Sequence, residues 1–177
     1  MGKDPAGLRR SREPLRNFYL RQNQFAYLAC QGKDASVARE LFLRIGDHWD
    51  KGTWKTQKFF ESCKKWASWM AARIDIAVSS AATNIQTAEG HQYDAQITTV
   101  FNERLTKAIE GCAARASKDA HRFDLFVLFN EQGSPQTFLA QPQTAVSDCL
   151  RPQVQALMFP PPPKPDYWLK INLGSLP

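Results

Sequence analysis

The sequence predicts an α+β fold, in which an N-terminal helical region is followed by a small antiparallel sheet with helices packed on one face. Apolar residues recur every three or four positions through most of residues 18–112, which is typical of amphipathic helices. The period changes to two between Phe123 and Phe129, which is typical of a strand. A chain of 177 residues with 43% hydrophobic residues is also long enough to bury a core.

Three helices are predicted in the first half of the chain. The first is expected over residues 18–28, where aromatic and leucine side chains stand at near-helical spacing. The second begins after a cap at Asp34 or Ser36 and ends before Gly46. The third has an apolar stripe that needs a partner surface to be stable, so it is expected to be core rather than a ligand platform. That stripe consists of Phe59, Cys63, Trp66, Met70 and Ile74.

A fourth helix and a hairpin are predicted next. Apolar residues at helical spacing run from Ile97 to Cys112. The strand at 123–129 then leads into the sequence NEQG, which places Gly133 at the bend, and a second strand continues through residues 137–139.

A short helix, a proline run and a last strand complete the predicted order. The helix is expected over residues 146–157, kinked or started late at Pro152. Each proline at 160–163 removes a backbone donor and holds the chain extended, so the run is a stiff leader. It delivers residues 167–173, which alternate in polarity, to the edge of the sheet as a strand.

The last strand contains the candidate partner-binding residues. An edge strand offers unpaired N–H and C=O groups, and a protein partner can add a strand there. The candidates are Tyr167, Trp168, Lys170 and Asn172. In the alternative interpretation, Tyr167 and Trp168 close the core and the N-terminal half covers the edge.

Composition divides the chain into four segments. Residues 1–16 are polar and basic, and we expect a flexible tail or a remnant of expression. Residues 17–78 form the helical region, and residues 93–177 form the α+β domain. Between them, residues 79–92 are small and polar and are expected to be the junction.

Four cysteines are widely separated, with no CxxC and no nearby histidine pair, so no metal site is expected. They admit three pairings, and their even spread favours one bridge in each half, Cys30 with Cys63 and Cys112 with Cys149. The alternative is four buried free thiols in a cytosolic protein.

The positive charge lies in the first half. Residues 1–75 carry 15 Lys and Arg against 8 Asp and Glu, whereas residues 76–177 carry 8 against 9. A basic half is typical of nucleic-acid binding, and cations alternate with aromatic residues in the helix at 54–73. The aromatic residues keep the period of a buried stripe, so nucleic acid is the alternative and not the first expectation.

No catalytic motif is present in the sequence. His48, His91 and His121 are scattered, and there is no GxSxG, HExxH or phosphate-binding glycine loop. The polar cluster Asp47–Asp50 is expected to cap a helix rather than to perform acid–base catalysis. We therefore expect no enzyme and no cofactor.

A predicted helix is followed by the stretches FDLFVLFNEQG, FLAQPQTAVSDCL, FPPPP and DYWLKINL. Together they give the order helix, hairpin, helix, proline segment and strand. In this order, residues 93–173 resemble the C-terminal domain of TonB-type periplasmic proteins. The resemblance implies an α+β fold, a Gram-negative cell envelope and a role in protein contact. The chain lacks the membrane anchor and the long proline-rich spanner of that family, so no energy transduction is expected, and the N-terminal half is not part of the pattern.

The expected function is therefore a non-catalytic periplasmic interaction module that binds a protein partner through its last strand. The resemblance also favours disulfides, since the periplasm is oxidising. A periplasmic inhibitor or immunity protein that binds a toxin is an alternative. The sequence as given shows neither a signal peptide nor an apolar run long enough to span a membrane. Periplasmic location requires a signal peptide that is not included here, and free cysteines would indicate the cytoplasm instead.

Overall fold

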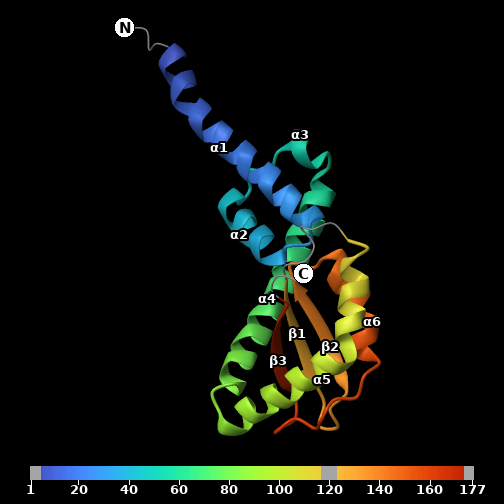
Figure 1. The fold of residues 1–177 in the computed structure, drawn as a ribbon. Coiled ribbons are helices and arrows are strands. Elements are labelled where there is room, and N and C mark those ends of the chain that lie inside the picture. Colours follow the sequence, from blue (N-terminus) through green and yellow to red (C-terminus); the bar gives the residue numbers. More distant parts are fainter. Residues whose placement is uncertain (1–4, 117–122, 174–177) are drawn as a thin grey trace. The chain divides into compact units, whose positions relative to one another are not determined.

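The computed structural model of the protein describes residues 5–116 and 123–173. The chain divides into two compact units, Met1–Ala71 and Ala72–Pro177. The fold is α+β, as predicted: helices come first, and a three-stranded antiparallel sheet follows (Figure 1). The division lies inside one continuous helix, α4 (Gln57–Asn84).

The first unit contains α1 (Pro5–Gln31), α2 (Ala35–Ile45), α3 (Lys51–Trp54) and the start of α4. The structure differs from the tail expected at residues 1–16, because α1 is helical from Pro5 onward. The first position of a helix tolerates proline, since its N–H would have no partner there. The following residues include good helix formers.

The core of the first unit is built around Trp54, which is fully buried. Its ring lies 5.5 Å from that of Phe42 and 5.3 Å from that of Phe60, measured between centroids. The predicted disulfide between Cys30 and Cys63 is present and joins α1 to α4. Asp34 caps α2 by accepting the Val37 N–H at 3.1 Å, and Gly46 ends the helix at a φ of 56°, as predicted.

Only part of the apolar stripe predicted on α4 is buried. Phe59 is 38% exposed, whereas its neighbour Phe60 is buried. The buried side of the helix continues through small residues to the end of α4. Its members are Phe60, Cys63, Ala67, Ala71, Ile74, Ala77, Ala81 and Asn84.

The expected junction at 79–92 is mostly helical. Residues 79–84 complete α4, and α5 (Ala88–Ala113) begins after the cap Thr87, whose hydroxyl accepts the Gly90 N–H at 2.9 Å. The small residues of this stretch are therefore packing and capping residues rather than a linker.

The second unit is a sheet in the order β2 (Pro135–Gln141), β1 (Phe123–Phe129), β3 (Tyr167–Leu173). Helices α5 and α6 (Ala145–Gln155) cover one face and enclose the main core. The second predicted disulfide, Cys112 with Cys149, joins these two helices.

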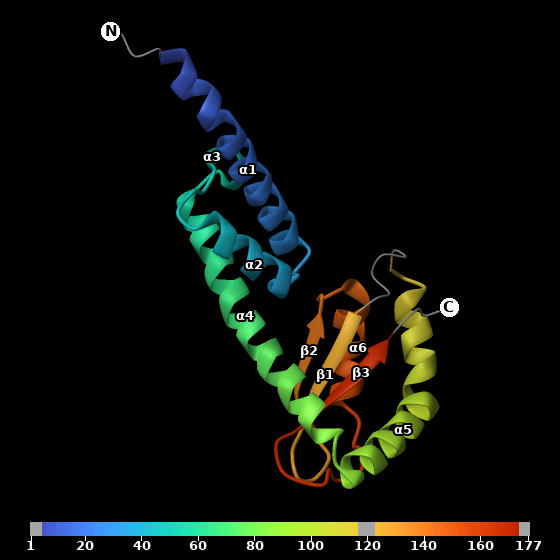
Figure 2. The ribbon, with the colours of Figure 1, turned by 90° about the vertical axis from the view of Figure 1, so that its left-hand side faces the viewer.

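The other face of the sheet also contains buried side chains, Phe126 and Leu139. The end of α4 lies on this side, opposite α5, as Figure 2 shows. Here Asn84 Nδ2 donates to the carbonyl of Trp168 at 2.9 Å. The end of α4 was not expected from the sequence to pack against the sheet.

Two hydrogen bonds hold the start of the proline leader in place, shortly after the end of α6. The Phe159 N–H donates to Gly133 O at 3.0 Å, and the Tyr93 hydroxyl donates to Pro160 O at 2.9 Å. Because prolines 161–163 have no N–H, the leader cannot extend the ladder, and it carries the chain from the hairpin bend to β3.

Candidate functional site

Strand β3 is an edge strand, and the described part of the chain has no strand on its outer side. Across the hairpin, the Asn130 N–H donates to Ser134 O, so even-numbered residues of β1 point their backbone groups toward β2. Odd-numbered residues of β1 then bond to β3. Val127 is paired with Leu169 and Leu125 with Ile171, so the odd-numbered residues of β3 point inward.

The backbone groups of Trp168, Lys170 and Asn172 consequently point to the outer edge. The hydrogen bond from Asn84 to the Trp168 carbonyl independently supports this outward direction, because Asn84 lies outside the sheet. This bond occupies the beginning of the edge. The outward groups of Lys170 and Asn172 are the part of the edge that an added strand would use.

The side chain of Tyr167 is not at this edge. It is 2% exposed and lies in the main core, where its ring is 5.0 Å from that of Tyr93 in an edge-to-face contact. Burial, and next the Asp94 carboxylate, raise the pKa of Tyr167 above its ordinary value. For Tyr167, the alternative interpretation of a core residue is the one that the structure supports.

The side chains of Trp168 and Lys170 lie on the face of the sheet opposite the main core. Lys170 Nζ is 2.8 Å from the Asp124 carboxylate and 5.8 Å from the centre of the Phe126 ring. Lys170 therefore already has an ion-pair partner. The backbone of Asn172 is paired with Asp124 in the register.

A groove runs beside β3 on the side of α5. It has a volume of about 290 Å³ and is formed by α5 and by residues 169–171 of β3. Its floor is apolar, with Ile97 and Leu169, and Asp94 stands on its rim. An added strand would point every second side chain into this groove. The sequence did not indicate it, because α5 and β3 are more than fifty residues apart.

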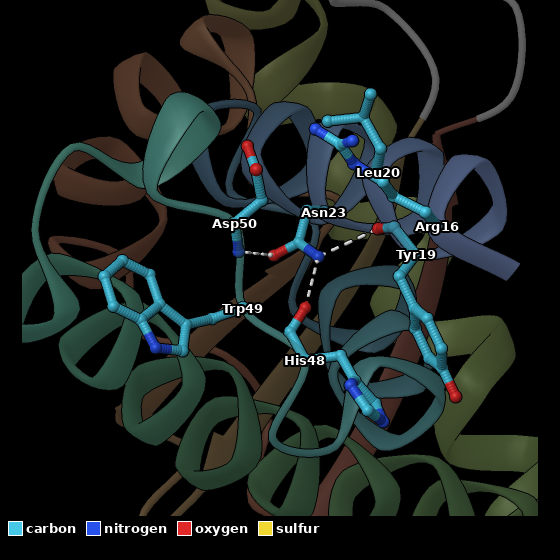
Figure 3. A pocket seen from close by; sticks show the side chains of 7 residues that line it. All are labelled: Arg16, Tyr19, Leu20, Asn23, His48, Trp49 and Asp50. Carbon is cyan, nitrogen blue, oxygen red and sulfur yellow. Dashed lines mark hydrogen bonds between the residues drawn. The ribbon is translucent and has the colours of Figure 1, made fainter. Parts of the chain in front are cut away.

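The polar cluster at Asp47–Asp50 is organised by a residue that the sequence analysis did not single out, Asn23. Its amide donates to Tyr19 O and to His48 O, both at 2.8 Å. Its oxygen accepts the Asp50 N–H at 3.1 Å and the Trp54 indole N–H at 2.8 Å. Asn23 lines a pocket with a volume of about 330 Å³. Figure 3 shows Asn23 among the other residues that line it.

The hydrogen-bonding capacity of Asn23 is thus filled by the protein itself. Asp50 caps α3 by accepting the Thr53 N–H at 2.6 Å, as predicted for this cluster. The ring of His48 stacks on that of Tyr19 at 4.1 Å between centroids. These groups position the loop.

The aromatic residues of the helix at 54–73 are divided between core and surface. Trp54 and Phe60 are buried and cannot stack on a base, whereas Trp69 is 56% exposed. Within residues 5–116 and 123–173, no three His, Cys, Asp or Glu side chains gather as a metal site would require. No helix of the described residues is long and apolar enough to cross a membrane.

Comparisons of the chain with protein-family models, with curated proteins and with solved structures find no match.

Proposed function

We propose that this chain is a non-catalytic interaction module of the cell envelope, which binds an extended segment of a protein partner along the outer edge of β3. The observation that carries the proposal is the direction of the backbone groups of Lys170 and Asn172, which point away from the sheet beside a groove. Main-chain bonds would supply affinity, and the groove would select side chains.

The periplasm is the proposed compartment. Both disulfides are compatible with an oxidising environment. The order α5, β1, β2, α6, β3 is also the order of elements on which the resemblance to the TonB C-terminal family rests. Both features support the proposal.

The test uses proline at the outward position Asn172. Asn172→Pro removes an N–H that faces the partner and leaves the bonds to β1 in place, which an edge strand tolerates. Asn172→Ala is the control, because it changes the side chain and keeps the N–H. We expect cell-envelope extract to yield one partner with the wild type and with Asn172→Ala, and to yield none with Asn172→Pro.

Thermal unfolding of the same three proteins completes the test. The proline variant should unfold at the wild-type temperature. A large loss of stability would place the Asn172 N–H in the sheet and contradict the geometry. Equal capture by both variants, or no capture by the wild type, would contradict partner binding at this edge.

A further inference from the structure

One side of α1 is apolar and exposed. Its large side chains recur at intervals of three or seven residues, which places them on one side of a helix. Each of them is between 46% and 63% exposed. On the opposite side of the helix, Asn23 and Ala26 are fully buried. We call the exposed set the outer stripe of α1, and its members are Leu15, Phe18, Phe25 and Leu28.

Positive charge accompanies the outer stripe. Arg21 is exposed and stands three residues after Phe18 and four before Phe25, so it lies on the same side of the helix. Along its whole length α1 contains five arginines and one acidic residue, Glu13. The sequence between residues 14 and 33 contains no Asp or Glu. The helix that presents the stripe is therefore strongly basic.

Asp50 also lies beside α1, but on its flank. It lines two pockets there together with Leu20, and of the outer stripe only Leu28 borders one of these two pockets. The Asp50 carboxylate caps α3, where one of its oxygens accepts both the N–H and the hydroxyl of Thr53. The charge between the two phenylalanines of the stripe is therefore set by Arg21.

The shape of the stripe favours a flat surface. The outer side of a single helix is convex, so a plane can contact it along its length. Figure 1 shows the start of α1 extending past α2 and α3. A helix with Phe and Leu on one side and an excess of Arg is typical of helices that lie in the interface of an anionic bilayer. Its apolar side chains enter the bilayer while its guanidinium groups stay at the phosphates.

Two other occupants fit the stripe less well. A second α1 would bring five more arginines against a single glutamate, so the two helices would repel each other. A nucleic acid would bind arginine and stack on phenylalanine, but Leu15 and Leu28 offer it neither a charge nor an aromatic ring. A bilayer uses both the charge and all four apolar side chains.

We propose that the outer stripe of α1 binds the surface of an anionic phospholipid bilayer. The helix lies along the surface, Phe18 and Phe25 enter between the head groups, and Arg21 contacts the phosphates. This activity goes beyond partner binding at β3 and does not depend on it, because α1 and β3 lie in different compact units.

The test is sedimentation of the full chain with sucrose-loaded vesicles. One set of vesicles contains equal amounts of phosphatidylglycerol and phosphatidylcholine, and the other contains phosphatidylcholine alone. We expect the partition coefficient to be at least about tenfold higher for the anionic vesicles, because each cation near the surface adds to the attraction. The difference should shrink as the salt concentration rises, since salt screens this attraction.

Matched variants locate the contact. Leu28→Ser is compared with Leu43→Ser, because Leu43 is a 78% exposed leucine of α2 outside the stripe. Arg21→Glu is compared with Lys58→Glu, which changes the net charge equally. Leu28→Ser, Phe25→Ser and Arg21→Glu should each lower the partition coefficient at least about fivefold, and the two controls should leave it within about twofold. Far-ultraviolet circular dichroism of all five variants checks that the helices remain.

Three results would overturn the proposal. One is that the wild type does not sediment with the anionic vesicles. Another is an equal loss in the stripe variants and in their controls, which would show a general effect of charge or of exposed leucine. The third is that another occupant takes the stripe while the vesicles stay unbound. This occupant would be a second copy if Phe25→Ser dissolves a dimer in analytical ultracentrifugation, and single-stranded DNA if Arg21→Glu abolishes its binding.

Discussion

Gly133 joins the hairpin to the proline leader. Its φ is 78°, and a Cβ added there would collide with the carbonyl oxygen of Phe159, whose own N–H donates to Gly133 O. We expect Gly133→Ala to lower the free energy of unfolding by about 1–3 kcal/mol, because the backbone is strained and the leader is displaced. Urea unfolding measures the change.

Gly111 is the matched control for this substitution. It lies inside α5, and an added Cβ meets no atom within 4 Å. Gly111→Ala should therefore stabilise the protein by about 0.5–1 kcal/mol. Equal stability of Gly133→Ala and the wild type would show that the leader is not anchored at the bend.

Tyr93 makes the stability of the folded protein depend on pH in the alkaline range. Burial raises the pKa of Tyr93, and its neighbour Tyr167 raises it further; the pKa of Tyr167 is raised as well. In the unfolded chain a tyrosine ionises near about pH 10. The stabilisation is therefore complete below that pH, and it is lost as the pH rises from there through the folded-state pKa values.

The variant Tyr93→Phe tests this dependence. It removes the bond to Pro160, at a cost of about 1 kcal/mol at neutral pH. Above pH 10 its stability should fall less steeply than that of the wild type, as unfolding curves between about pH 8 and 11 would show. Parallel curves would contradict the role of Tyr93.

At the scale of elements, β3 is part of the core as well as the edge. Tyr167 and Leu169 are 2% and 4% exposed, and each buried side chain contributes about 1.5–3 kcal/mol. Truncation after Pro165 should therefore unfold the second unit and abolish its near-ultraviolet circular dichroism. A truncated protein that keeps its full melting transition would show that the strand is peripheral.

The ion pair between Lys170 and Asp124 joins β3 to β1. The two side chains are 40% and 41% exposed, so solvent screens the ion pair. Its contribution to the free energy of unfolding is therefore about 0.2–1 kcal/mol. A double-mutant cycle of Lys170→Gln and Asp124→Asn should give a coupling energy in this range that decreases with salt. A coupling energy of zero at low salt would show that the pair is not formed.

At the scale of the whole molecule, each compact unit contains one disulfide. The bridges close loops with sequence separations of 33 and 37 residues, which corresponds to about 3–4 kcal/mol each in the chain-entropy estimate. Replacing both cysteines of one pair by serine should lower the free energy of unfolding by this amount. Mass spectrometry of non-reduced peptides checks the pairing, and four free thiols would contradict both the pairing and the oxidising compartment.

By itself the sequence determined the order of the strands and of the longer helices, a cap at Asp34 or Ser36, a capping role for the cluster Asp47–Asp50, the bend at Gly133 and the favoured pairing of the cysteines. The elements, caps and bend depend on local periodicity and on turn residues, so the neighbouring residues suffice to predict them. The cysteine pairing was favoured among three possibilities by the even spread of the cysteines along the chain. The start of α1 and the end of α4 differ from the expected tail and junction, because basic and small side chains are compatible with a helix as well as with a tail or a junction.

Only the tertiary structure decided which groups of the last strand are accessible. The outward direction of Lys170 and Asn172 depends on how β1 pairs with both of its neighbours, and the groove beside them depends on α5. Asn84 reaches Trp168 over 84 residues, and Asn23 reaches Trp54 over 31. Such contacts follow from packing between elements, and no local pattern in the sequence encodes them.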